Sequence, residues 1–460
     1  AIALALEISA NHFQMTYYLL LLVLVLGAYE LYQTIRSKEW RSFVKSLFTL
    51  VAAALLAVLM NATLLLTTKE YEAFSTRGKS DLLLNADGTP KRHTHGLSKD
   101  YITEYSYGVY ESLNLVVPRL LGGSNHENMG EKSAVYERLI HSYPREQVLE
   151  FTRHLPTYWG DQPIVAAPAY VGILTFFFFV LALFVVRQRA KWWLLAGVVL
   201  SLLLSWGKNF NLLTDLMIDY FPLYNKFRAV SSVQTILEFC MPVLAILGLY
   251  TYLTDEKRAH YKQYLYYTGG IVAGLLLLLW LAKGSLSFVG ASDAYYAQAY
   301  GEELMQLIRQ DREAMYTADI FRSFAYVVLA FGVLYLFTIA KIKEKVAFVL
   351  ISILLVADIA GVTTRYLSEE NYAFPSEKEN YFTLSPEEEK IREDKSYYRV
   401  FSVQEGLNGA RTSYNFHSVG GYHAAKPRRV QELFDYQLYK NKNDQVLNLL
   451  NVKYILQTDR

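Results

Sequence analysis

Four short basic loops, each joining two long apolar runs, constrain the fold of this chain more than any other feature of its sequence. The runs approach about 20 residues, the length of a helix that crosses the roughly 30 Å hydrocarbon core of a bilayer. They cover residues 15–35 and 43–66, 164–186 and 192–206, 233–253 and 265–281, and 321–340 and 346–363. The loops carry Arg36, Lys38, Arg41 and Lys45; Arg187, Arg189 and Lys191; Lys257, Arg258 and Lys262; and Lys341, Lys343 and Lys345. The sequence therefore predicts a polytopic α-helical membrane protein with about eight transmembrane helices.

The charge of the loops also predicts an orientation. Lys and Arg in short loops remain on the cytoplasmic side of a membrane, and the four basic loops agree with one another. The long loops, residues 67–163, 207–232 and 283–320, then face outward. We expect a multi-pass protein of the bacterial cytoplasmic (inner) membrane, with its large loops and its chemistry on the periplasmic side.

Composition argues against other classes of protein. Hydrophobic residues make up 53% of the chain, and the net charge is only +2. A soluble helical protein would carry charges at helical spacing within the runs, yet residues 43–66 contain only Lys45 and residues 265–281 contain none. The single cysteine, Cys240, lies inside a run and is expected to be a core residue. No basic patch interleaved with aromatic residues suggests a nucleic-acid partner.

The chain divides into four parts by composition. They are the N-terminal membrane helices (1–66), the first large outer loop (67–163), a six-helix membrane region (164–363) and a polar outer-face region (364–460). In the last part, residues 397–403 and 452–457 are expected to be strands of an α/β domain, and Ser385-Pro386 is expected to start a helix. Because the chain begins without Met inside an apolar stretch and stops just after the second strand, we expect a truncated piece of a longer protein.

Two motifs are set aside. Arg77-Gly78-Lys79-Ser80 contains the Gly-Lys-Ser of a phosphate loop, but Ala73 occupies the position of the earlier glycine. His93 and His95 flank a threonine without carboxylates at metal-ligand spacing, so they are expected to be ordinary loop histidines. No metal site is predicted.

A group of cations lies at the outer ends of the membrane runs, although Lys and Arg are usually enriched on the cytoplasmic side. They are Lys208, Lys226, Arg228 and Arg77. Lipid phosphate is the anion available at that depth, and Arg is well shaped to bind it; the alternative is that these side chains reach toward headgroups without specificity. The acids Asp100, Glu104, Glu111 and Asp161 lie near these same outer helix ends, which form the outer membrane rim. A carboxylate beside a lipid phosphate could act as a general base, whereas the alternative role is solvated or capping.

Two further acids, Glu238 and Asp358, fall within apolar runs. Charge there is costly, so each should pair with a partner or line a cavity. Either could belong to a transport path, and Glu238 is close enough to the end of its run to reach the rim instead.

Several segments together resemble one family. They are Ile8-Ser9-Ala10-Asn11-His12-Phe13-Gln14-Met15-Thr16-Tyr17-Tyr18, residues 75–80, Tyr105-Ser106-Tyr107-Gly108, residues 156–163, residues 221–228, Gly420-Gly421-Tyr422-His423-Ala424-Ala425-Lys426 and residues 450–455. They resemble the YfhO-type bacterial membrane proteins of the Bacteroidetes kind, and the similarity runs through essentially the whole chain. That family looks like a branch of the fold-C glycosyltransferases.

The resemblance implies transfer of a sugar from a polyprenyl-phosphate donor to an envelope glycan or polymer at the outer face, without a cofactor. Lys226 and Arg228, with Lys208 and Arg77, would bind the donor phosphate, and Trp159 or Tyr158 would stack on sugar. The family's catalytic carboxylate would lie upstream of Ala1, which leaves Asp161, Glu111 and Glu104 as the candidates present. The expected partners are the bilayer, the lipid-linked donor and the glycan acceptor. Alternatives are a transporter or flippase of lipid-linked intermediates and a non-catalytic envelope scaffold.

Overall fold

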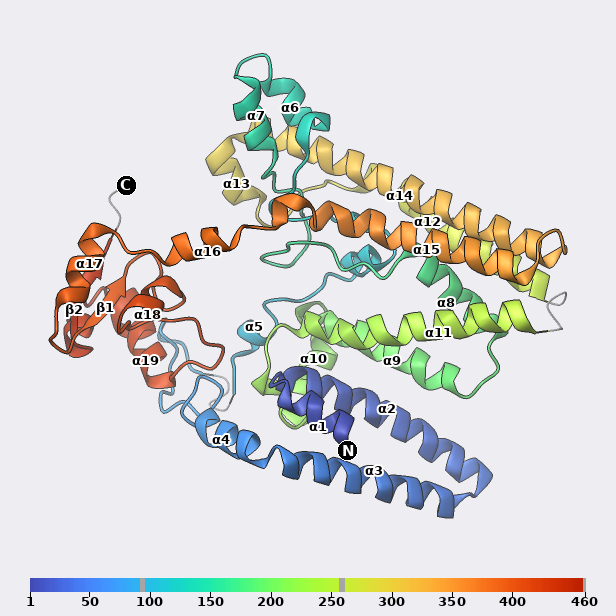
Figure 1. Ribbon diagram of the computed structural model, residues 1–460, viewed down its shortest axis with the longest axis horizontal. Coiled ribbons are helices and arrows are strands. Elements are labelled where there is room, and N and C mark those ends of the chain that lie inside the picture. Colours follow the sequence, from blue (N-terminus) through green and yellow to red (C-terminus); the bar gives the residue numbers. More distant parts are fainter. Residues whose placement is uncertain (92–95, 256–260, 458–460) are drawn as a thin grey trace. The chain divides into compact units, whose positions relative to one another are not determined.

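The computed structural model describes residues 1–91, 96–255 and 261–457, which form two compact units (Figure 1). Unit 1 contains Ala1–Ser9, Leu55–Ser98 and Ser368–Arg460, and unit 2 contains Ala10–Ala54 and Lys99–Leu367. Residues 67–98 of the first long loop belong to unit 1, and the rest of that loop belongs to unit 2. His93, His95, Lys257 and Arg258 lie outside the described residues.

Among the described residues, six helices are long and apolar enough to cross a membrane. They are α2 (Phe13–Ser37), α3 (Trp40–Met60), α11 (Gln234–Thr254) with the preceding turn η5 (Val230–Val233), α12 (Lys262–Ala282) with η7 (Lys283–Ser285), α14 (Glu302–Thr338) and α15 (Glu344–Tyr366). A seventh crossing is obtained if α9 (Ala190–Ser205) is counted with η3 (Gly207–Phe210) and α10 (Asn211–Tyr220), which are bent by 106° relative to it. The chain is therefore a helical multi-pass membrane protein.

The expected number of about eight crossings is corrected to six or seven. Apolar residues 164–186 are helical only in α8 (Ile173–Val185), which has 13 residues. Pro168 disfavours helix before it, and Gly172 has a φ of +106°, which interrupts the helical path. The preceding segment is held instead by loop contacts, since the Val171 N–H donates to the Leu115 carbonyl at 3.0 Å.

Although short, α8 is the central helix of unit 2. It packs against α11, α12, α14 and α15, and most of its side chains are buried. By contrast, α3 exposes large apolar side chains such as Leu55 and Leu59. An apolar helix surface of this kind is expected to face lipid chains rather than water.

The third long loop, expected at residues 283–320, is shorter than predicted, because the membrane helix expected at residues 321–340 begins within it. The structure has a short helix, α13 (Asp293–Tyr300), followed by one continuous helix of 37 residues, α14. Gly301, with a φ of +84°, separates the two. Because about 20 residues span a bilayer core, α14 extends well beyond it.

Short elements of unit 2 lie between the long helices. They are α5 (Lys99–Ile102), η1 (Tyr110–Leu115), η2 (Gly130–Lys132), α6 (Ala134–Leu139), α7 (Arg145–Thr152) and η4 (Tyr224–Lys226). Figure 1 shows α6 and α7 in teal beside α13 and the first turns of α14, and α6 contacts α14 directly.

Unit 1 contains short helices and one two-stranded parallel sheet. Its elements are α1 (Ile2–Ser9), α4 (Ala62–Glu72), η8 (Glu369–Asn371), α16 (Pro375–Phe382), α17 (Pro386–Glu393), β1 (Arg399–Ser402), α18 (Arg411–Asn415), α19 (Arg428–Leu433), η9 (Phe434–Lys440), α20 (Gln445–Leu449) and β2 (Val452–Leu456). β1 pairs directly with β2, and Phe401 of β1 belongs to an apolar core together with Phe434. The expected helix start at Ser385 is confirmed: its hydroxyl accepts the Glu388 N–H at 3.3 Å.

The carboxylate of Asp394 links α17 to β2. It accepts bonds from Lys453 Nζ at 2.5 Å and from the Tyr454 hydroxyl at 2.9 Å. The hydrogen bond from Lys453, assisted by those from Ser396, holds the pKa of Asp394 well below its usual range. The folded carboxyl therefore binds a proton less readily than the unfolded one. Its stabilising contribution is complete above the unfolded pKa of about 4 and is lost as the pH falls toward the folded pKa.

We therefore expect the thermal midpoint of the wild-type protein to decline more steeply between about pH 5 and about pH 3 than that of the Asp394→Asn variant. Unfolding in one detergent across this pH range measures the difference. Asp444→Asn is a suitable control, because Asp444 is exposed at the start of α20 and makes no side-chain capping bond. Parallel pH curves for wild type and Asp394→Asn would contradict the prediction.

Candidate functional site

The segment containing Glu104 and Glu111 packs directly against the segment containing Lys208 and Arg228. The Tyr107 N–H donates to the Ser205 carbonyl at 3.0 Å, and the Ser231 N–H donates to the Tyr105 carbonyl at 3.1 Å. The Lys208 N–H donates to the Ser106 hydroxyl at 3.1 Å. These bonds gather most of the residues expected at the membrane rim within unit 2.

Glu111 is the buried centre of this region. It is 1% exposed, and its carboxylate accepts the Tyr158 hydroxyl at 2.6 Å, Gln162 Nε2 at 3.0 Å and the Gly108 N–H at 3.0 Å. Burial and the charge of Glu111 raise the pKa of Tyr158, so the phenol remains a donor. With these bonds made, Glu111 fixes the loop at residues 158–162 from the inside.

Asp161, by contrast, lies on the surface beside two polar side chains. Asn209 Nδ2 donates to Asp161 Oδ2 at 3.1 Å and also to the Tyr107 carbonyl at 2.9 Å. Lys208 Nζ donates to the Asp161 backbone carbonyl at 3.3 Å. All three side chains are exposed. The Asp161 carboxylate and the Lys208 ammonium group are therefore both accessible in the same part of the surface.

Arg228 lies against two tyrosines of the neighbouring segment. Its Nη1 donates to the Tyr101 hydroxyl at 2.5 Å, and the guanidinium lies 4.8 Å from the Tyr101 ring centre and 5.7 Å from that of Tyr105. Burial lowers the pKa of Arg228, but the bond to Tyr101 and the charge of the exposed Glu104 outweigh this and raise it. Lys226 is partly buried in η4 nearby in sequence.

The turn that carries these cations is conformationally strained. Leu223 and Ala229 have φ values of 66° and 57°, a left-handed conformation that costs free energy for residues with a side chain. The Arg228 carbonyl is in turn fixed by Gln14 Nε2 at 2.7 Å. Strain held in place by surrounding contacts is frequent at binding sites.

Glu238 is exposed on α11. Burial raises the pKa of Tyr107, and the negative charge of Glu111 adds to this effect, with a smaller contribution from Glu238.

The two aromatic residues expected to stack on sugar pack against other side chains, and the fourth expected cation belongs to the other unit. Tyr158 is buried and bonded to Glu111, and Trp159 packs on Phe288 with ring centres 5.2 Å apart. Arg77 belongs to unit 1, where its Nη2 donates to the Ala424 carbonyl at 3.5 Å.

A buried ion-pair network supports the rim and was missed from the sequence. Asp319 on α14 is 1% exposed and binds both Arg119, at 2.8 Å, and Arg365 on α15, at 2.8 Å. Arg119 also pairs with Glu127 at 3.4 Å, and Glu127 accepts the Thr157 hydroxyl at 2.7 Å. The network ties the loop at residues 119–127 to both long helices.

A second buried arginine holds the chain on which Tyr158 and Asp161 lie. Arg312 on α14 is fully buried, pairs with Asp293 at 2.9 Å and donates to the Pro156 carbonyl at 2.8 Å. It also donates to the Tyr158 carbonyl at 3.4 Å. The position of the 156–161 segment is therefore set from α14.

Asp358, expected to pair or to line a cavity, is paired. Its carboxylate lies 3.0 Å from Arg322 Nη2, accepts the Tyr170 hydroxyl at 2.7 Å and receives the Leu174 N–H at 3.3 Å. The last bond satisfies one of the backbone donors at the start of α8. These contacts give Asp358 a structural role at a helix terminus.

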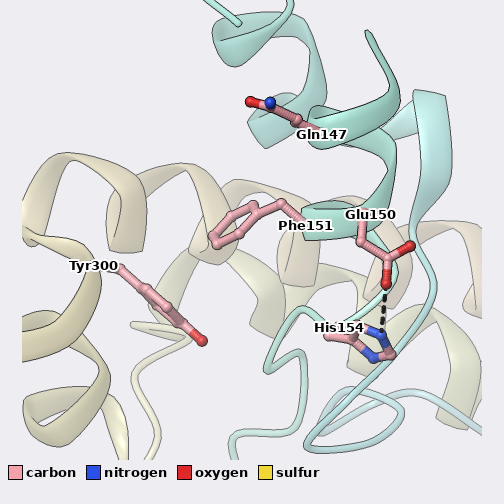
Figure 2. A pocket seen from close by; sticks show the side chains of 5 residues that line it. All are labelled: Gln147, Glu150, Phe151, His154 and Tyr300. Atoms are coloured by element: carbon pink, nitrogen blue, oxygen red, sulfur yellow. Dashed lines mark ion pairs between the residues drawn. The ribbon is translucent and has the colours of Figure 1, made fainter. Parts of the chain in front are cut away.

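Two hollows of unit 2 are lined by residues other than those of the rim. Two cavities of about 400 and 540 Å³ lie between α6–α7 and α13–α14 and share Gln147, Phe151 and Tyr300. Figure 2 shows Phe151 of α7 and Tyr300 of α13 together with Glu150 and His154, whose side chains form a 3.7 Å ion pair. Within the described part of the chain, no group of three or more His, Cys, Asp or Glu residues is placed to hold a metal ion.

Comparison of the chain with protein-family models, with curated proteins and with solved structures finds no match.

Proposed function

We propose that this chain is part of a fold-C-like membrane glycosyltransferase that uses a polyprenyl-phosphate sugar and an envelope glycan or polymer at the outer, periplasmic face of a bacterial inner membrane. The observation that carries the proposal is the proximity of Asp161 to Lys208 and Asn209, both of which donate hydrogen bonds to it. It joins a candidate base to a candidate phosphate ligand in η3, directly after α9, where the bent helix pair breaks. In this proposal unit 1, with its parallel strand pair, is an outer α/β domain.

The reaction would be an inverting displacement. The acceptor hydroxyl loses its proton to the Asp161 carboxylate as its oxygen attacks the anomeric carbon of the donor sugar. The bond from that carbon to the phosphate oxygen breaks, and its electron pair remains on the lipid phosphate. Lys208 and Arg228, with Lys226, would stabilise that charge.

Asp161 is preferred to the other two candidate acids for physical reasons. Glu111 is buried and already accepts several hydrogen bonds, so an acceptor cannot reach it without breaking them. Glu104 is exposed, and its charge acts on Arg228, which suits a role in placing the guanidinium. The transporter alternative has less support, because Asp358 is engaged at the start of α8 rather than lining a path.

The test is removal of one rim cation at a time. Arg228→Ala and Lys208→Ala should each reduce transfer of radiolabelled glucose, galactose or mannose from a polyprenyl-phosphate donor by about a hundredfold, the usual effect of losing one donor to a developing charge. Arg189→Ala, in a short basic loop at the other end of the helices, should retain normal transfer. Unchanged turnover in both rim variants would overturn the phosphate assignment. Movement of the lipid without sugar transfer would favour a flippase.

A further inference from the structure

The hollow between α7 and α13 has the form of a ligand groove and is separate from the rim. The α7 groove is lined by Gln147, Glu150, Phe151, His154, Tyr300 and Glu303. Its two parts, about 400 and 540 Å³, fall within the size range of ligand sites, roughly 300–1,000 Å³. The groove is therefore large enough to hold a ligand.

The floor of the groove is fixed before any ligand binds. Buried Val135, Leu155, Met305 and Ile308 form one apolar cluster beneath it, and Phe151 packs against that cluster. A preformed floor reduces the ordering cost of binding. The groove is thus a stable surface feature of α6, α7 and α14.

Aromatic rings provide its apolar surface. Phe151 and Tyr300 (Figure 2) meet edge to face with ring centres 5.5 Å apart. Tyr300 also stacks on Tyr296, with ring centres 6.0 Å apart. Tyr300 remains 37% exposed. The electron-rich face of an exposed ring attracts weakly positive C–H groups, which a sugar ring presents on its apolar side.

The charges around the groove are balanced. Arg138 pairs with Glu303 at 3.0 Å, while Glu150 pairs with Arg153 at 2.9 Å and lies 3.7 Å from His154. An anionic ligand would find no surplus of positive charge, and an acyl chain would have to cover charged groups. A neutral ligand rich in hydroxyl groups suits both the rings and the polar side chains.

We propose that the α7 groove binds a neutral carbohydrate chain. Gln147, Glu150 and His154 would exchange hydrogen bonds with its hydroxyls, and Tyr300 would cover one ring face. That this carbohydrate is the growing acceptor rests on the proposed transferase function, whereas the binding itself does not.

Binding can be measured on the full chain in nanodiscs, which avoids detergents with sugar headgroups. Maltohexaose, mannohexaose and chitohexaose are titrated by calorimetry, with saturation-transfer NMR to identify the sugar rings in contact. We expect at least one to bind, and Tyr300→Leu to weaken its binding about five- to tenfold through loss of the stacking face. Tyr295→Leu is the matched control, since Tyr295 lies on the same helix, is 71% exposed and does not line the groove. It should leave the dissociation constant unchanged.

Gln147→Ala provides a second variant that cannot disturb the core, because Gln147 is exposed on α7. It should also weaken binding. The inference is overturned if none of the hexasaccharides binds, or if Tyr300→Leu and Gln147→Ala both bind as wild type does. Preference for an acidic peptide or a fatty acid over all three sugars would overturn it too.

The two proposals fail in different ways. Sugar binding that persists in a protein without transfer activity would remove the transferase function and leave the groove. If Tyr300→Leu loses carbohydrate binding but transfers sugar normally at low acceptor concentration, the groove still binds carbohydrate. In that case the bound carbohydrate is not the acceptor.

Discussion

Asp161→Asn is expected to reduce sugar transfer by about 10²–10⁴-fold, the range usually attributed to one general base. Asn keeps the size of the side chain, and its carbonyl oxygen can still accept the bond from Asn209 Nδ2. Asp161 is exposed, so the substitution should not alter the thermal midpoint. Turnover with saturating labelled donor, compared with the Michaelis constant for the acceptor, separates lost chemistry from lost binding. We expect the decrease in kcat.

Asp100→Asn is the matched control for this prediction, because Asp100 is an exposed acid on the neighbouring helix α5. It should retain wild-type turnover. Glu111→Gln should behave differently from both, lowering the thermal midpoint because a buried hydrogen-bonding centre is altered. If Asp161→Asn keeps near-normal kcat, Asp161 is not the base.

Asp319→Leu should be the most destabilising single substitution considered, by about 3–5 kcal/mol. It leaves the partly buried Arg119 and Arg365 without the carboxylate that both bind at 2.8 Å. Breaking a buried pair from one side is costly because the remaining charge stays desolvated. Unfolding midpoints in a fixed detergent measure the effect. If the loss is at the upper end of this range, we expect little folded protein at moderate temperature.

Two comparisons make that result specific. Asp215→Leu removes a more exposed carboxylate that pairs with Lys99 at 2.6 Å, and it should cost less than about 1 kcal/mol. Adding Arg365→Met to Asp319→Leu should recover part of the loss, since the positive charge stranded on α15 is then gone. Equal destabilisation by the Asp319 and Asp215 variants would mean that the buried network contributes no more to the free energy of unfolding than an exposed ion pair does.

The membrane architecture could be predicted because helix length and loop charge are local properties. The pairs α2–α3, α8–α9 and α14–α15 fall on both sides of loops containing Lys38, Arg189 and Lys343. The shortened α8 was missed because apolar residues continue through 164–172 even though Pro168 and Gly172 oppose a helix there. Hydrophobicity alone does not distinguish an apolar loop from a helix.

The rim could be predicted only in part. Lys208 and Arg228 were identified from their charge beside membrane runs, but their neighbours depend on contacts across the sequence. Asp319 and Arg119, for example, are 200 positions apart. One usable signal was present: Arg312 and Asp319 continue the spacing of three or four residues that begins with Met305 and Ile308. Charges within such a stripe indicate buried pairs.

If the proposed transfer takes place, the continuous helix α14 has a consequence for how the product leaves. From Glu303 at the groove to Arg312, which holds the Pro156 and Tyr158 carbonyls, the helix rises about 14 Å at about 1.5 Å per residue. A single helix makes this spacing rigid. A polymer held at Glu303 would stay tethered while its end is extended near Asp161. The protein would then add several units per encounter instead of releasing the chain after each one.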